Sequence, residues 1–415
     1  MKQTLNFAQI AEKEKRYLIH TYDRLPVLMV SGEGCTLIDD QGKKYLDFLG
    51  GLAVNSLGHA HPEIMEVLRD GSETLLHVSN LLFHPYQADV AERLCRLSGL
   101  DRVFFCNSGT EAVEGALKLA RAYARKQEGG DGKSTSKLEV LALEDSFHGR
   151  TVGALSATWP EKYRAPFEPL VPGVRFVSAR DVKKLESGFR DTVGAFLIEI
   201  IQGEGGVVPL DESYLKRAQE LCRAQGALLI CDEIQCGLGR TGQPFAYQKF
   251  GLKPDIVLAA KPLAAGLPMG AILAREEVAE AFGPGSHGST FGGGPLQCRL
   301  ASKFLEILER PGFLDHVREM GGYLRSRLEE LSDLPAVQKV RGEGLMMALV
   351  LEVPGKQIVK TLLDQGILIN CTQEKILRFL PPLTIEREHV DRLAAALRRV
   401  LAGITKIPAG KGVPV

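Results

Sequence analysis

Residues 226–261, GALLICDEIQCGLGRTGQPFAYQKFGLKPDIVLAAK, contain two short apolar runs, and each run is followed directly by a charged side chain. ALLIC precedes Asp232, and DIVLAA precedes Lys261. Short, almost wholly apolar runs bounded by turn residues are typical of strands buried on both faces of a parallel sheet. Five further runs of this kind are RVFFC (102–106), LEVLAL (138–143), VRFV (174–177), GAFLIEII (194–201) and GAILA (270–274).

Segments with helical periodicity separate these predicted strands. In the segment that follows Asp211, apolar residues recur on one helical face, Asp211 can cap the start, and Gly226 can end the helix. Alternation of strands and helices predicts an α/β fold with a mainly parallel, seven-stranded sheet.

The two ends of the chain have a different pattern. Residues 24–48 contain short strand-like pieces, and helical segments after residue 300 surround shorter apolar runs. We therefore predict a smaller α+β domain made from residues 1–55 and 310–415. Residues 56–309 form the predicted large domain, which contains the sheet.

Composition excludes several classes of protein. The 415 residues are 45% hydrophobic and 25% charged, and 51 basic residues balance 51 acidic ones, so neither disorder nor a general attraction to nucleic acid or anionic membrane is indicated. No apolar run approaches the ~18 residues that cross a bilayer. We expect a cytoplasmic protein with no nucleic-acid or membrane partner. Eight scattered cysteines without a C-x-x-C motif predict free thiols and no metal site.

Ligands of open α/β sheets bind beyond the carboxyl ends of the strands. Ser108, Gly109 and Thr110 follow RVFFC and open a helix, where free N–H groups and the helix dipole can bind a phosphate. The alternative is a simple capping box of Ser108 with Glu111. This alternative assigns the helix start a structural role only.

Asp232 and Lys261 each follow a predicted strand, which places a carboxylate and an amine near one sheet edge. An amine can form a Schiff base with a flat cofactor while a carboxylate keeps the cofactor's pyridine nitrogen protonated, as pyridoxal phosphate chemistry requires. Taken separately, the aspartate could be a turn residue and the lysine a solvated one.

Longer motifs extend this pattern over most of the chain, from Tyr22 to Pro382. They are YDRLPV, GKKYLDFLGGLAVNSLGHAHP, FFCNSGTEAVEGALKLAR, SFHGRTVGALSAT, EIIQGEGGV, CDEIQCGLGRTG, HGSTFGG and ILRFLPPL. Together they resemble the class III, or ornithine-type, aminotransferases, which are pyridoxal-phosphate enzymes of fold type I.

The resemblance implies a set of cofactor-binding residues. Lys261 would be the Schiff-base lysine and proton shuttle, and Asp232 would pair with the pyridinium nitrogen. Of the remaining cofactor-binding positions, Ser108, Gly109 and Thr110 would hold the phosphate, Phe147 would stack on the ring, Gln235 would bond the ring hydroxyl, Glu199 would lie near the cofactor, and Thr290 would reach the phosphate of a neighbouring subunit's cofactor. The last position implies a homodimer with active sites at the subunit interface.

The resemblance also implies the substrates. Arg150 and Arg378 would each bind a carboxylate, and Glu204 would pair with Arg378 when no second carboxylate is present. The implied reaction transfers the ω-amino group of N-acetylornithine, or a close analogue, to 2-oxoglutarate, giving a semialdehyde and glutamate in arginine biosynthesis. Ornithine, succinylornithine, N-acetyllysine and 4-aminobutyrate are alternative donors. A non-catalytic scaffold on the same fold is disfavoured by the presence of Lys261, Asp232 and Arg150.

Overall fold

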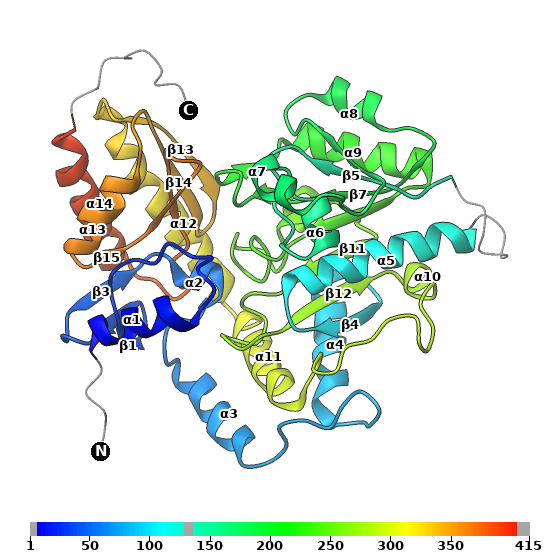
Figure 1. The fold of residues 1–415 in the computed structure, drawn as a ribbon, viewed down its shortest axis with the longest axis horizontal. Coiled ribbons are helices and arrows are strands. Elements are labelled where there is room, and N and C mark those ends of the chain that lie inside the picture. The colour runs from blue at the N-terminus through cyan, green and yellow to red at the C-terminus, as the bar shows by residue number, and fades with distance from the viewer. Residues whose placement is uncertain (1–5, 128–135, 405–415) are drawn as a thin grey trace.

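The computed structural model describes residues 6–127 and 136–404. Its main feature is a seven-stranded sheet with strand order β4-β12-β11-β10-β7-β5-β6 (Figure 1). The strands are β4 (Arg102–Cys106), β5 (Glu139–Leu143), β6 (Val174–Val177), β7 (Val193–Ile198), β10 (Leu228–Asp232), β11 (Ile256–Ala259) and β12 (Gly270–Ala274). Within this sheet β12 pairs antiparallel with both of its neighbours, and the other strands run parallel to one another. The predicted strands and the mainly parallel sheet are confirmed.

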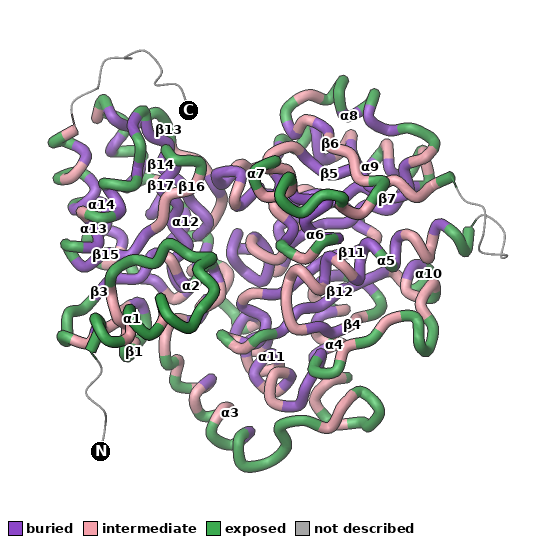
Figure 2. Tube along the Cα trace, in the orientation of Figure 1, coloured by how far each residue is buried: buried purple, intermediate pink, exposed green. Residues whose placement is uncertain are grey.

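Two apolar cores cover the two faces of this sheet. Leu228 and Ile230 of β10 pack in the core that contains α5 (Gly109–Gln127), whereas Leu229 and Cys231 pack in the core that contains α9 (Glu212–Gln225). This alternation follows from the two-residue period of a strand. Helices therefore cover both faces, and buried chain fills the space between them (Figure 2).

Helix α9 begins and ends where the sequence predicts. Asp211 occupies the N-cap position, but its side chain makes no capping hydrogen bond. Gly226 ends the helix with φ 64°, a left-handed conformation that glycine adopts without a steric penalty. The remaining helices before residue 312 are α1 (Phe7–Tyr17), α2 (Gly50–Ala53), α3 (Pro62–Ser72), α4 (Pro85–Ser98), α6 (Val152–Ser156), α7 (Glu161–Arg164), α8 (Val182–Gly188), α10 (Glu276–Ala279) and α11 (Pro295–Leu308).

Both ends of the described chain build two smaller sheets. One has the order β1-β2-β3-β15 and the other β13-β14-β17-β16. Their strands are β1 (Met29–Glu33), β2 (Thr36–Asp39), β3 (Lys44–Asp47), β13 (Val337–Glu343), β14 (Met346–Leu351), β15 (Ile367–Leu368), β16 (Asn370–Thr372) and β17 (Ile376–Phe379). The short strands β8 (Ile201–Gln202) and β9 (Val208–Pro209) form a separate pair near the large sheet.

The smaller sheets share a core with helices α12 (Phe313–Glu329), α13 (Lys356–Asp364) and α14 (Arg387–Ala402). Strand β15 pairs with β3, so the early and late parts of the chain meet here (Figure 1). This distribution supports our proposal that residues 1–55 and 310–415 form the small domain and residues 56–309 the large one, although residues 1–5, 128–135 and 405–415 lie outside the described part of the chain. Among the helices of residues 6–127 and 136–404, none is long and apolar enough to cross a membrane.

Arg240 joins the two parts of the molecule at a buried position. Its guanidinium donates hydrogen bonds to the carbonyl oxygens of Leu345 and Pro381 and, over 2.9 Å, to Ser56 Oγ. Burial lowers the pKa of Arg240 to about 9. The acceptors come from residues far apart in sequence, so one cation fixes three segments around it.

Glu233 fixes the segment after β10 in a comparable way. Its Oε2 accepts the N–H of Ala246 at 2.9 Å and its Oε1 accepts that of Tyr247 at 2.8 Å. Burial raises the pKa of this carboxyl to about 7. The contacts connect the chain beyond Asp232 to the core.

We predict that Glu233→Ala lowers the free energy of unfolding by about 2–4 kcal/mol, because two buried N–H groups lose their acceptors. Glu233→Gln is the matched control, since it retains one acceptor oxygen, and it should lose less. Denaturant unfolding followed by circular dichroism measures both. Equal stability of wild type and the alanine variant would contradict the assignment.

Candidate active site

A cavity of about 480 Å³ lies beyond the carboxyl ends of β4, β7, β10 and β11. This is the edge at which open α/β sheets bind ligands. The predicted site residues that line it are Ser108, Gly109, Thr110, Phe147, Arg150, Glu199, Glu204, Asp232, Gln235 and Lys261. The structure therefore brings together segments that are up to about 150 residues apart in the chain, because parallel strands end at a common edge.

Asp232 is the last residue of β10 and is buried. Its Oδ1 accepts the N–H of Ile234 at 3.1 Å, and its Oδ2 lies 2.7 Å from Nδ1 of His148. His148 was not among the predicted site residues, although it stands between Phe147 and Arg150 in the motif SFHGRT. His148 is fully buried and fixes the orientation of the Asp232 carboxylate.

Lys261 follows β11 and lines the cavity. Burial lowers its pKa, while the charges of Asp232 and Glu204 oppose that shift. A lowered pKa increases the fraction of neutral amine, which is the nucleophilic form. Lys261 also has a φ of 33°, an unusual value for a residue with a Cβ, and such conformations cluster at functional sites.

The start of α5 combines capping contacts with an open N-terminus. Ser108 Oγ accepts the N–H of Glu111 at 3.3 Å, but the Glu111 carboxylate accepts the N–H of Asn107 rather than that of Ser108. The first N–H groups of a helix have no partner inside it. A Cβ added at Gly109 would lie 2.8 Å from Ile234, so only glycine fits here without displacing that side chain.

Arg378 lies in β17 and reaches the cavity wall from the smaller sheets. Only 1% of its side chain is exposed, and its Nη1 donates to Glu204 Oε1 at 2.5 Å. The same nitrogen lies 3.4 Å from Gln235 Oε1, and Nε lies 3.3 Å from Asn370 Oδ1. The predicted pairing of Arg378 with Glu204 is thus present as a contact.

Arg150 has a different environment. It makes no hydrogen bond or ion pair with any residue in the described part of the chain, and its guanidinium carbon lies 3.7 Å from the ring centroid of Tyr163 and 5.4 Å from that of Phe147. Its hydrogen-bonding edge is available to a ligand.

Glu199 follows β7 and connects two parts of the cavity wall. Its Oε2 accepts the N–H of Phe147 at 3.1 Å and its Oε1 accepts that of Gly203 at 3.1 Å. Burial raises the pKa of Glu199 to about 7, opposed by the nearby His148. In this chain the carboxyl orders the backbone beside the cavity.

Thr290 is the one predicted site residue that borders a different recess. Its neighbours there include His77, Asn80, His84 and Gly293. The contact of Thr290 with the phosphate of a neighbouring subunit's cofactor stays a prediction.

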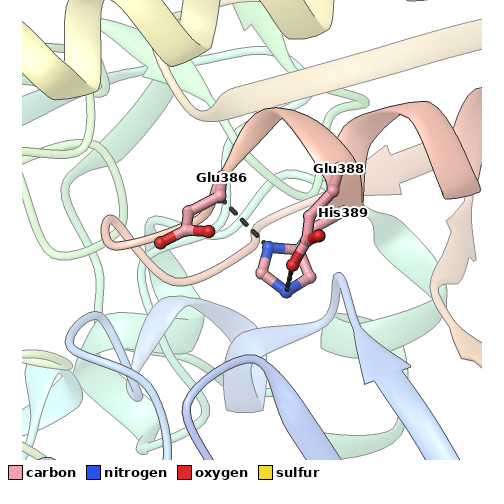
Figure 3. Close-up of side chains that lie close together, drawn as sticks. All are labelled: Glu386, Glu388 and His389. Carbon is pink, nitrogen blue, oxygen red and sulfur yellow. Dashed lines mark hydrogen bonds and ion pairs between the residues drawn. The ribbon is translucent and has the colours of Figure 1, made fainter.

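A cluster of possible metal ligands lies away from the cavity, at the start of α14 (Figure 3). His389 Nδ1 accepts the N–H of Glu386 at 3.1 Å, and His389 Nε2 lies 3.8 Å from Glu388 Oε1. The contact between Glu386 and His389 is part of the helix cap. The eight cysteines are free thiols, and six are buried.

The family model "Aminotransferase class-III" matches residues 17–401. The chain belongs to this family. It is an aminotransferase with the predicted fold type I architecture, which the comparisons confirm.

Similar proteins share nearly the whole length of this class III aminotransferase. It is 49% identical to an acetylornithine aminotransferase of Aquifex aeolicus over 93% of this chain and 100% of that protein. It is 46% identical to an acetylornithine aminotransferase of Methanocaldococcus jannaschii, with 95% of this chain and 98% of that protein covered.

Solved structures are similar over the same range. An ornithine aminotransferase from Toxoplasma gondii has a TM-score of 0.90 and 33% identity, covering 95% of this chain and 96% of that one. An acetylornithine aminotransferase from Elizabethkingia anophelis has a TM-score of 0.85 and 30% identity, covering 96% and 100%.

Proposed function

We propose that this class III aminotransferase binds pyridoxal phosphate in the cavity and transfers the ω-amino group of N-acetylornithine to 2-oxoglutarate. The observation that carries the proposal is the placement of the Asp232 carboxylate and the Lys261 amine at one cavity, with the cations of Arg150 and Arg378 beside it. The names of the most similar curated proteins support the choice of donor.

The residues around the cavity fit this cofactor. Bound there, pyridoxal phosphate supplies an electron sink for the reacting amine carbon. Asp232, oriented by His148, would keep the pyridine nitrogen protonated. Ser108, Gly109 and Thr110 would bind the phosphate at the start of α5, where the N–H groups and the helix dipole favour an anion.

The other groups would position the ring and move a proton. Phe147 would cover one ring face, and Gln235 would bond the ring hydroxyl. Glu199 would hold the backbone of Phe147 through the hydrogen bond described above. Lys261 would carry the proton between the two carbon atoms that exchange it, since its amine lines the cavity and burial lowers its pKa.

The two arginines explain how one site would accept two different substrates. Both substrates carry a carboxylate several bonds away from the reacting carbon, and we assign this shared carboxylate to Arg150. 2-Oxoglutarate has a second carboxylate, which would displace Glu204 from Arg378. The acylated donor lacks that second carboxylate, so Glu204 would then remain paired with Arg378. A buried guanidinium without a partner would raise the free energy of the complex.

We predict that Glu204→Ala impairs the half-reaction with N-acetylornithine and spares or improves the half-reaction with glutamate. Arg378→Ala should chiefly weaken glutamate and 2-oxoglutarate, by about 10²–10³-fold in kcat/KM, as expected when a bidentate carboxylate contact is lost. Glu204→Gln serves as a control that removes the charge and keeps the shape. Single-turnover absorbance spectra measure each half-reaction, and equal losses in both halves for Glu204→Ala would contradict the switch.

Ornithine is a second candidate donor, because solved ornithine aminotransferases are among the similar structures. Initial rates with 2-oxoglutarate and a panel of donors decide between them. We expect the highest kcat/KM with N-acetylornithine, ahead of ornithine, succinylornithine, N-acetyllysine and 4-aminobutyrate. A preference for ornithine would overturn the assigned donor and leave the aminotransferase activity intact.

We further propose a cytoplasmic homodimer that acts in arginine biosynthesis. Support for the dimer comes from strongly exposed apolar side chains, Leu81, Leu82, Phe83 and Phe291, the last of which adjoins Thr290. Sedimentation of the purified protein tests the dimer. A monomer with full activity would contradict the proposed role of Thr290 at a partner's cofactor.

A further inference from the structure

The two arginines at the cavity are held by different physical interactions. Arg378 is buried and paired with the Glu204 carboxylate. Arg150 is exposed and contacts aromatic rings, with the nearest ring centroid, that of Tyr163, 3.7 Å from its guanidinium carbon. The sequence motifs include Arg150, but Tyr163 has no role in the function described so far.

Tyr163 comes from α7, a helix anchored by other contacts. The N–H of Trp159 donates to the carbonyl of Ser146 at 3.0 Å, and the Trp159 ring packs edge-on against Phe176 of β6 with centroids 5.1 Å apart. Arg164 donates from Nε to the carbonyl of Trp159 at 3.2 Å and lies 4.9 Å from the Phe176 ring centroid. Both flanks of Tyr163 are thereby fixed to the large sheet.

We propose that Tyr163 is a positioning residue that holds Arg150 at the cavity wall and leaves the arginine free to bind a substrate carboxylate. A ring that stacks on the guanidinium face leaves the in-plane N–H groups unoccupied. A carboxylate partner would occupy those N–H groups, and a substrate would have to displace it. The inference rests on the proposed function, in which Arg150 binds the carboxylate that all substrates share.

The two arginines would therefore bind a substrate carboxylate in different ways. Arg378 exchanges one carboxylate for another, whereas Arg150 has no competing anion in the described part of the chain. Without the ring, the long Arg150 side chain would have to be ordered by the substrate itself, which weakens binding. The chemical step would be unaffected, because Tyr163 makes no hydrogen bond or ion pair with Lys261 or Asp232.

The test compares Tyr163→Leu with Tyr163→Phe in the cofactor-loaded enzyme. Tyr163→Leu should raise the KM for 2-oxoglutarate and the Kd of the unreactive dicarboxylate glutarate by about 3–30-fold, the range for a cation–π contact. The kcat should stay within about twofold of the wild-type value, because the lost contact stabilises the bound substrate and the transition state equally. Tyr163→Phe should behave like wild type, because the Tyr163 hydroxyl makes no hydrogen bond with the described residues. Steady-state kinetics and titration calorimetry supply the values.

Two further variants separate this inference from the proposed function. Glu161→Gln, an exposed change on the same helix, should leave both constants unchanged. Arg150→Ala should raise both constants at least as much as Tyr163→Leu does. If Arg150→Ala does so and Tyr163→Leu does not, Tyr163 has no positioning role and the proposed function stands.

Other outcomes are equally decisive. If Arg150→Ala changes neither constant, the carboxylate site assigned to Arg150 is wrong, and the inference falls with it. Tyr163→Phe with the defect of Tyr163→Leu, or a fall in kcat at constant KM, would also overturn the inference. Should Tyr163→Leu lower the melting temperature, Tyr163→Gln replaces it as the non-aromatic variant, with the same expectation.

Discussion

Lys261→Ala should reduce transamination by about 10⁴–10⁶-fold, the loss expected when a covalent nucleophile is removed. Among residues 6–127 and 136–404, no other lysine lines the cavity, and burial lowers the pKa of the Lys261 amine. The variant should fold normally, because the side chain makes no hydrogen bond or ion pair with the described residues. Turnover near the wild-type rate would refute the assignment.

A labelling experiment and a control variant accompany this prediction. Wild-type protein reduced with borohydride should carry the cofactor on the peptide that contains residue 261, and the variant should carry none there. Lys249→Ala is the matched control, since that lysine pairs with Glu343 outside the cavity over 2.7 Å. The control should retain wild-type kcat and the same labelled peptide.

Asp232→Asn should lower kcat by about 10²–10³-fold, the loss typical of removing one preorganised electrostatic contact. A neutral amide cannot keep a pyridine nitrogen protonated. The fold should persist, since an asparagine oxygen can still accept the N–H of Ile234. Much of the cofactor should stay bound, because the residues proposed for its phosphate are unchanged.

Stopped-flow absorbance of the half-reaction with glutamate measures this loss directly. Asp255→Asn is a useful control, because Asp255 lies just before β11, whereas Lys261 and the cavity lie beyond the other end of this strand. Asp255 accepts the N–H of Leu229 at 2.7 Å. It should change stability more than rate. An Asp232→Asn variant with wild-type rate and cofactor content would reduce Asp232 to a turn residue.

The local pattern of the sequence was sufficient to predict the seven strands and the position of Asp232 and Lys261 at strand ends. Runs such as ALLIC and DIVLAA, which are short, largely apolar and bounded by turn residues, are typical of strands that are covered on both faces. The local pattern could not predict whether β12 runs parallel or antiparallel to its neighbours, because an apolar run such as GAILA has the same composition in either direction. Its antiparallel pairing depends on the short turns that follow Lys261.

The motifs also identified most residues that line the cavity, because each motif places them next to a strand end. They could not reveal that His148 contacts Asp232, and the pairing of Glu204 with Arg378 followed from the resemblance to the family, not from local spacing. His148 and Asp232 are 84 residues apart, and Glu204 and Arg378 are 174 apart. The local sequence around each residue carries no information about such a partner.

The sequence by itself therefore determined the strands, their helical connections, the family and the chemical groups at the cavity, since these follow from local periodicity and from residues in a fixed order. Only the tertiary structure decided that His148 orients Asp232 and that Tyr163 stacks on Arg150, and it contains the contact between Glu204 and Arg378 that the resemblance implied. The physical reason is that hydrogen bonds and ring contacts act over a few ångströms. Which distant segments come within that range is set by the packing of the sheets, not by the local chain.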